Sequence, residues 1–233
     1  MKRVKSIGLI RNNDSKIIGD LIFSLFKNNG MEVGLISDGF IRVNEDCKKR
    51  RLNDQRDIER LLGDENSLDY IIFDNLQEKS MYDLTKQFEI NTLIDDEFMG
   101  GNKQNNRMVE TKINIFNNLK RNGIAIINSD NKTLNDYFSC LKDKIIVTYG
   151  LNTKSTITAS SLDINGTVSF NCCIQRGITT FNGNEIEQME FPIRTMAYDD
   201  FNVCDFLAAI SLALIYEVSI DNIQNTIYSL DYS

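Results

Sequence analysis

The chain has 233 residues, of which 42% are hydrophobic and 25% are charged, a composition typical of one large globular domain. A net charge of −7 disfavours a nucleic-acid partner. No apolar run approaches the ~20 residues of a membrane helix, so we expect a cytoplasmic protein that binds neither nucleic acid nor membrane. Histidine is absent, which excludes serine–histidine triads and removes the commonest general base.

Short apolar strands alternate with helices through the first 150 residues. The first strand is "IGLI" at residues 7–10, and the apolar pattern predicts a helix over residues 17–28. Further strands are predicted at residues 32–37, 69–75, 90–95, 124–130 and 144–150. Further helices are predicted at residues 57–63, 81–88 and 106–121. This alternation predicts a parallel sheet covered by helices on both faces.

The pattern changes after Gly150. Polar and apolar residues alternate around an Asn-Gly pair at residues 165–166, which predicts a hairpin in a small antiparallel sheet. An apolar helix begins near Val203, and a shorter helix follows at residues 219–230. We therefore predict one α/β domain over residues 1–233. Its parts are a mostly parallel sheet (1–150), a small antiparallel sheet (151–200) and closing helices (201–233).

The five cysteines form no Cys-x-x-Cys pair. Cys172 and Cys173 are adjacent, so in a strand they point to opposite faces. We interpret all five as reduced thiols, and the alternatives are a zinc site or a nucleophile.

Several segments occur in an order that suggests a known family. They are "IRNNDSKII" (10–18), "NTLIDDEF" (91–98), "ETKINIF" (110–116), "VTYGLN" (147–152) and "DFNVCDFLAAISLAL" (200–214). Together they resemble the central, ATP-binding domain of the Mur ligase family, and most closely the UDP-N-acetylmuramyl tripeptide synthetases. The resemblance implies a P-loop-like α/β fold with ATP and magnesium as cofactors. Family members carry a C-terminal ligase domain, and many an N-terminal substrate domain; we expect both to be absent from this chain.

The phosphate loop of the family reads I-T-G-T-N-G-K-T-T. The resemblance implies that nucleotide binds to the corresponding residues here, which are Asn12, Asn13, Asp14, Ser15, Lys16 and Ile17. Asn12 and Ser15 replace the two glycines that let backbone N–H groups wrap a phosphate. Ile17 replaces the hydroxyl that binds magnesium, and Lys16 is retained. The alternative is a plain strand–turn–helix with a solvated lysine.

The resemblance also implies a metal site and a catalytic lysine. Asp74 and Glu97 take the positions of the magnesium ligands, and Lys112 corresponds to a carbamylated lysine that positions metal and substrate. Lys112 is conspicuous on independent grounds. It falls inside an apolar helical face formed by Met108, Val109, Ile113, Phe116 and Leu119. A lysine in that position needs a partner, and the alternative to a site role is an ion pair with a nearby acid.

Asn202 and Asp205 correspond to an Asn-x-x-Asn pair that lies near adenine in the family. Asp205 departs from that pattern. The alternative for Asn202 is the N-cap of the apolar helix.

Two functions follow from these residues. The first, which we favour, is a catalytically degenerate domain with at most weak ATP or anion binding. It would serve cell-wall precursor metabolism as a partner or regulatory subunit, together with a protein partner or a separate ligase domain. The second is an active ATP-dependent ligase that joins an acid to an amino acid through an acyl phosphate. The first is favoured because the loop glycines, the magnesium hydroxyl and the family's histidine are all replaced.

Overall fold

The computed structural model of the chain describes residues 4–11, 17–37, 40–43, 46–51, 56, 68–77, 79–86, 88–96, 106–131, 138–196 and 202–230. Eleven strands of these residues form one sheet, in the order β13-β10-β9-β8-β7-β6-β1-β5-β2-β3-β4. Its parallel centre consists of β1 (Lys5–Ile10), β2 (Val33–Ser37), β5 (Tyr70–Phe73), β6 (Ile90–Asp95), β7 (Leu119–Asn128) and β8 (Ile145–Tyr149).

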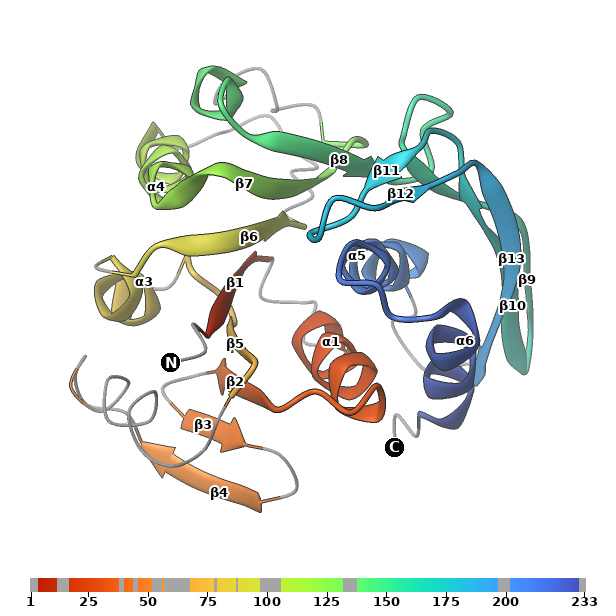
Figure 1. Cartoon of the computed structure of the whole chain (residues 1–233), viewed down its shortest axis with the longest axis horizontal. Coiled ribbons are helices and arrows are strands. Elements are labelled where there is room, and N and C mark those ends of the chain that lie inside the picture. The colour runs from red at the N-terminus through yellow and green to blue at the C-terminus, as the bar shows by residue number, and fades with distance from the viewer. Residues whose placement is uncertain are drawn as a thin grey trace.

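Helices cover both faces of this parallel centre, as the alternation of strands and helices predicts (Figure 1). One face is packed against α1 (Ile17–Asn28) and α5 (Val203–Ile215), and α6 (Ile220–Ser229) lies beside them along β13. The other face carries α3 (Lys79–Thr85) and α4 (Asn106–Asn117). The apolar side chains accordingly form two cores, one on each side of the sheet.

The antiparallel part extends the main sheet. β9 (Ile157–Asn165) and β10 (Thr167–Ile174) form the predicted hairpin, and Gly166 between them has a φ of +73°, which favours glycine. β13 (Met189–Met196) pairs with β10 at the edge. Tyr149 at the end of β8 pairs with Ile157, which joins the hairpin to the parallel strands. A separate small sheet consists of β11 (Ile178–Thr179) and β12 (Glu185–Ile186).

Two features differ from the sequence-based expectation. The helix predicted to reach residue 121 ends at Asn117, because Leu119 already pairs with Ile90 in the sheet and Asn122 turns the chain with a φ of +57°. Two antiparallel strands, β3 (Phe40–Val43) and β4 (Asp46–Arg51), were not predicted. β4 is a charged edge strand, and such a strand lacks the apolar alternation that identifies a strand in a sequence. The helix predicted at residues 57–63 lies outside the described residues.

No helix among the described residues is both long enough and apolar enough to span a bilayer. A short 3₁₀ helix, η2 (Phe138–Leu141), precedes β8.

Candidate functional site

Six neighbouring parallel strands carry polar groups where they end. In sheet order, the residues at or just after these ends are Tyr149 (β8), Asn128 (β7), Asp95 (β6), Arg11 (β1), Asp74 (β5) and Ser37 (β2). All six strands run parallel, so these groups lie along one edge of the sheet, which we call the carboxyl edge. Ligands of open α/β sheets bind at this edge.

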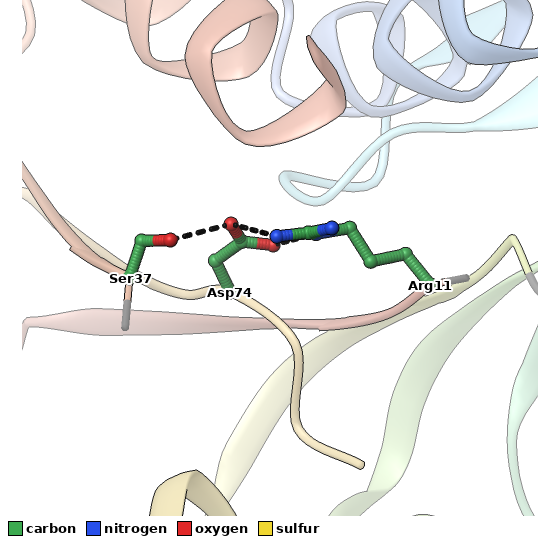
Figure 2. Close-up of polar contacts among 3 residues, drawn as sticks. All are labelled: Arg11, Ser37 and Asp74. Atoms are coloured by element: carbon green, nitrogen blue, oxygen red, sulfur yellow. Dashed lines mark hydrogen bonds and ion pairs between the residues drawn. The ribbon is translucent and has the colours of Figure 1, made fainter. Parts of the chain in front are cut away.

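Arg11 and Asp74 form a buried ion pair at the centre of the carboxyl edge (Figure 2). The Nε of Arg11 lies 2.6 Å from Oδ1 of Asp74, and Nη2 lies 3.1 Å from Oδ2. The hydroxyl of Ser37 donates to Oδ2 at 2.9 Å. Both charged residues are nearly inaccessible, with 4% of Arg11 and 3% of Asp74 exposed. Together with Ser37, the pair joins the ends of three adjacent strands, β1, β5 and β2.

The start of α1 packs directly on this ion pair. A Cβ atom placed on Gly19 would stand 3.4 Å from the carboxyl carbon of Asp74, an ordinary contact distance, so the first turn of the helix lies against this carboxylate. Asp20, in the first turn of the same helix, bonds Arg42 at 3.0 Å. The side chain of Asp20 is 61% exposed; partial desolvation at the helix start raises its pKa, Arg42 opposes that rise, and the nearby charge of Asp74 adds to it. Two carboxylates therefore lie close together at the helix start.

Lys112 projects from α4 and pairs with Asp95 on the other face of the sheet. Its Nζ lies 2.9 Å from both carboxylate oxygens of Asp95. Lys112 is 4% exposed and Asp95 is 1% exposed. The partner that the apolar surroundings of Lys112 require is thus the last residue of β6. Asp95 points toward α4, whereas Arg11 and Asp74 point toward α1, so the two ion pairs leave the edge on opposite faces.

Asp96 lies next in sequence but faces α5. Tyr149 donates its hydroxyl to Oδ1 of Asp96 at 2.5 Å, and the Asp96 backbone N–H donates to Ile10. Burial, followed by the negative charge of Asp205, raises the pKa of Asp96 to about 8, although the Tyr149 hydrogen bond acts in the opposite direction. Asp96 is therefore protonated in the folded protein at neutral pH.

This protonation predicts a pH dependence of stability. Unfolded Asp96 loses its proton near its ordinary pKa of 3.8, whereas folded Asp96 keeps it until about pH 8. Between these two pH values Asp96 carries a proton in the folded state that it lacks in the unfolded state. The contribution of Asp96 to the free energy of unfolding therefore falls as pH rises, by up to about 1.4 kcal/mol per pH unit. Asp96→Asn, which still accepts from Tyr149, is expected to lack this fall. Urea unfolding of both proteins across this range measures it, and equal slopes would refute the assignment.

The first turn of α5 uses Asn202 and Asp205 for capping. Asn202 Oδ1 accepts from the N–H of Cys204 at 3.0 Å, and its Nδ2 donates to Asp205 at 2.9 Å. The N-cap alternative for Asn202 is confirmed by this geometry. Burial, with help from Asp130 and Asp96, raises the pKa of Cys204 to about 12. Cys204 is therefore a thiol, not a thiolate nucleophile.

The other candidates are placed as follows. Ile17 is the first residue of α1. Asn12, Asn13, Asp14, Ser15, Lys16 and Glu97 lie outside the described residues.

The described residues do not fit a magnesium ion at Asp74. Both oxygens of this carboxylate already accept hydrogen bonds, and its charge is balanced by a guanidinium. The side chain of Ile17 has no oxygen, and magnesium binds through oxygen ligands. No group of three metal-binding side chains occurs in the described part of the chain.

Comparison with known proteins identifies this architecture. Residues 67–213, well over half of the chain, match the profile of the Mur ligase middle domain. The chain belongs to the Mur ligase family. A comparison of this Mur ligase domain with curated protein sequences gave no significant match.

Solved structures share the fold of this Mur ligase domain. A UDP-N-acetylmuramoyl-L-alanyl-D-glutamate–2,6-diaminopimelate ligase superposes with a TM-score of 0.74, at 16% identity over 99% of this chain and 47% of the other. A UDP-N-acetylmuramoylalanyl-D-glutamyl-2,6-diaminopimelate–D-alanyl-D-alanyl ligase from Acinetobacter baumannii gives 0.70, at 14% identity over 98% and 46%. Folylpolyglutamate synthetase from Lactobacillus casei gives 0.65, at 11% identity over 98% and 63%. The chain thus spans about half the length of the two former ligases.

Sequence reasoning missed Arg11, Ser37 and Asp95 at the carboxyl edge of this Mur ligase domain, and Asp96 directly after it. Arg11 carried a signal, since a charged residue directly after the buried strand "IGLI" must be paired if the strand end is covered. For Asp95 and Asp96 the sequence signal was weaker: two adjacent acids at the end of an apolar strand. Nothing local in the sequence marks Ser37.

Proposed function

We propose that this Mur ligase middle domain is catalytically degenerate and binds ATP or another anion weakly at most. One observation carries the proposal: the candidate metal ligand Asp74 and the candidate catalytic Lys112 are each paired with an opposite charge of the same chain. Asp74 is bonded to Arg11, and Lys112 is bonded to Asp95. A ligase site needs its carboxylate for a metal and its lysine for chemistry, and here each is held in a buried ion pair.

The charge balance supports weak anion binding. Among the described residues of the carboxyl edge, Arg11 and Lys112 are each neutralised by a carboxylate, and Asp205 lies near protonated Asp96. Little positive charge is left there to attract the phosphates of a nucleotide, apart from Lys16 in the loop sequence.

The surrounding pathway is proposed from the relatives. Two structures with the same fold are ligases of UDP-N-acetylmuramoyl peptides, so we place this domain in cell-wall precursor metabolism as a partner or regulatory subunit. The chain spans 47% and 46% of those two proteins. We propose that a protein partner or a separate ligase domain completes its function.

The second candidate is an active ligase that forms an amide through an acyl phosphate. The family membership favours it, as does an FPGS–AMPPCP complex among the structures with the same fold. In this case Lys16 would hold the phosphates, and ligand binding would have to break the Arg11–Asp74 and Lys112–Asp95 pairs.

Thermal unfolding with and without MgATP separates the two candidates. A ligand that binds the native state raises its stability, but weak binding, with a Kd near the ligand concentration, adds only about 0.4 kcal/mol. We expect a shift no larger than this at millimolar MgATP. A ligand present at 100 times its Kd would add about 2.7 kcal/mol, and a rise of that size would contradict the proposal.

Two variants serve as controls for this measurement. Lys16→Met tests whether any shift depends on the loop lysine. Ser15→Gly combined with Ile17→Thr restores a glycine and the hydroxyl of a working loop, and we expect it to strengthen ATP binding.

A further inference from the structure

We infer that the guanidinium of Arg11 takes the place of a divalent cation at Asp74, so that the carboxyl edge contains its own fixed positive charge and holds no metal there. The inference rests on the proposed function only in treating this edge as the former ligand site. It assigns to Arg11 a role that the sequence motifs did not suggest.

The guanidinium of Arg11 and the carboxylate of Asp74 meet in a bidentate geometry. Arg11 approaches Asp74 through two nitrogens, Nε at 2.6 Å and Nη2 at 3.1 Å, which is the two-pronged arrangement that binds a carboxylate most strongly. Ser37 takes a third acceptor position at 2.9 Å. A carboxylate offers about four such positions, so little of Asp74 is left for a metal.

A second carboxylate lies near Asp74. Asp20 follows Gly19 in the first turn of α1, and Gly19 lies against the carboxyl group of Asp74. Two neighbouring carboxylates favour a bound cation, and hard divalent cations prefer such oxygen ligands. Arg11 supplies that positive charge from the chain itself, and Arg42 bonds Asp20 on the outer side.

Arg11 occupies a central position in the sheet. Arg11 directly follows β1, the strand that lies between β5 and β6 at the centre of the parallel sheet. Its side chain turns toward β5 and lies below the start of α1 (Figure 2). Arg11 is 4% exposed, so its guanidinium cannot replace its contact with Asp74 by contacts with water unless the side chain moves. The positive charge is therefore a permanent part of the fold.

Titration with Mn²⁺, followed by the electron paramagnetic resonance signal of the free ion, tests the inference without any nucleotide. Wild-type protein is expected to show no site that depends on Asp74. Arg11→Ala is expected to gain Mn²⁺ affinity by roughly tenfold or more, since release of about 1.4 kcal/mol of competing interaction changes a binding constant tenfold. Arg11→Lys, which keeps the positive charge, serves as the matched control and should resemble wild type.

The double variant Arg11→Ala/Asp74→Asn identifies the site, because it should lose the gained affinity. An Arg11→Ala protein that folds and gains no affinity would overturn the inference. If that variant does not fold, an NMR measurement on the wild-type protein tests the inference instead. Mn²⁺ should not selectively broaden the amide signals of Gly19 and Ser37. Selective broadening of these signals would overturn the inference. These Mn²⁺ experiments contain no ATP. A result that overturns the inference therefore says nothing about the proposed weak nucleotide binding, which the thermal unfolding experiment with MgATP tests separately.

Discussion

Arg11→Met is expected to lower the free energy of unfolding by about 3 to 5 kcal/mol, because it leaves the carboxylate of Asp74 buried without its cation. Asp74 is 3% exposed, so water cannot take over the role of the guanidinium without local opening of the structure. The hydroxyl of Ser37 remains as a hydrogen-bond donor, but it does not balance the charge. Urea unfolding followed by circular dichroism measures the change.

A double-mutant cycle separates the ion pair from the general cost of altering the site. Arg11→Met, Asp74→Asn and the combined variant complete the cycle, and the combined variant should be less destabilised than the sum of the single variants, by about 0.5 to 3 kcal/mol. Removing both partners leaves no unpaired buried charge, which is why part of the loss is recovered. Simple additivity of the two single changes would show that the pair is not coupled as its geometry indicates.

Lys112→Met is expected to cause a loss of similar size, about 3 to 5 kcal/mol, on the opposite face of the sheet. It leaves Asp95, which is 1% exposed, without the ammonium that lies 2.9 Å from both of its oxygens. The methionine side chain fills most of the space of the lysine stem, so the lost charge partner, not a cavity, causes the effect. Thermal and urea unfolding measure it.

The matched control for Lys112→Met is Lys86→Met. Lys86, directly after α3, pairs with Asp83 of that helix at 3.5 Å, and both side chains are about half exposed. Exposed pairs of this kind contribute between about 0 and 1 kcal/mol, so this change should be nearly silent. If both lysine variants lost the same small amount, the Lys112–Asp95 pair would not be the buried interaction described above.

The sequence predicts the parallel centre well because its signal is local. Apolar runs such as "IGLI" and "INTLID" mark buried strands, and the helical spacing of apolar residues places Lys112 on an inward face. The structure confirms that Lys112 and Phe116 are buried, but Ile115 is buried where the sequence predicted Ile113, and Val109 and Ile113 are half-buried. The predicted helix is longer than α4 because Leu119 fits an apolar helix face and an apolar strand equally well.

The partners of the charged residues could not be predicted, because they depend on the order of strands in space. Arg11 meets Asp74 only because β1 lies beside β5, although 63 residues separate them in the chain. Asp95 and Asp96 are equivalent acids in the sequence. Because side chains alternate along an extended chain, Asp95 points toward Lys112 and Asp96 points toward Tyr149. Which acid lies on which face can be predicted only when the register of the sheet is known.

The central claim is that Asp74 and Lys112 are paired within the chain and take no part in holding a metal. A crystal structure of the protein grown with Mn²⁺ and a non-hydrolysable ATP analogue, with anomalous scattering to locate manganese, tests it most directly. The account predicts Arg11 on Asp74, the uncarbamylated amine of Lys112 on Asp95, and no manganese bonded to Asp74. A manganese ion coordinated by Asp74, or a carbamate on Lys112, would contradict it.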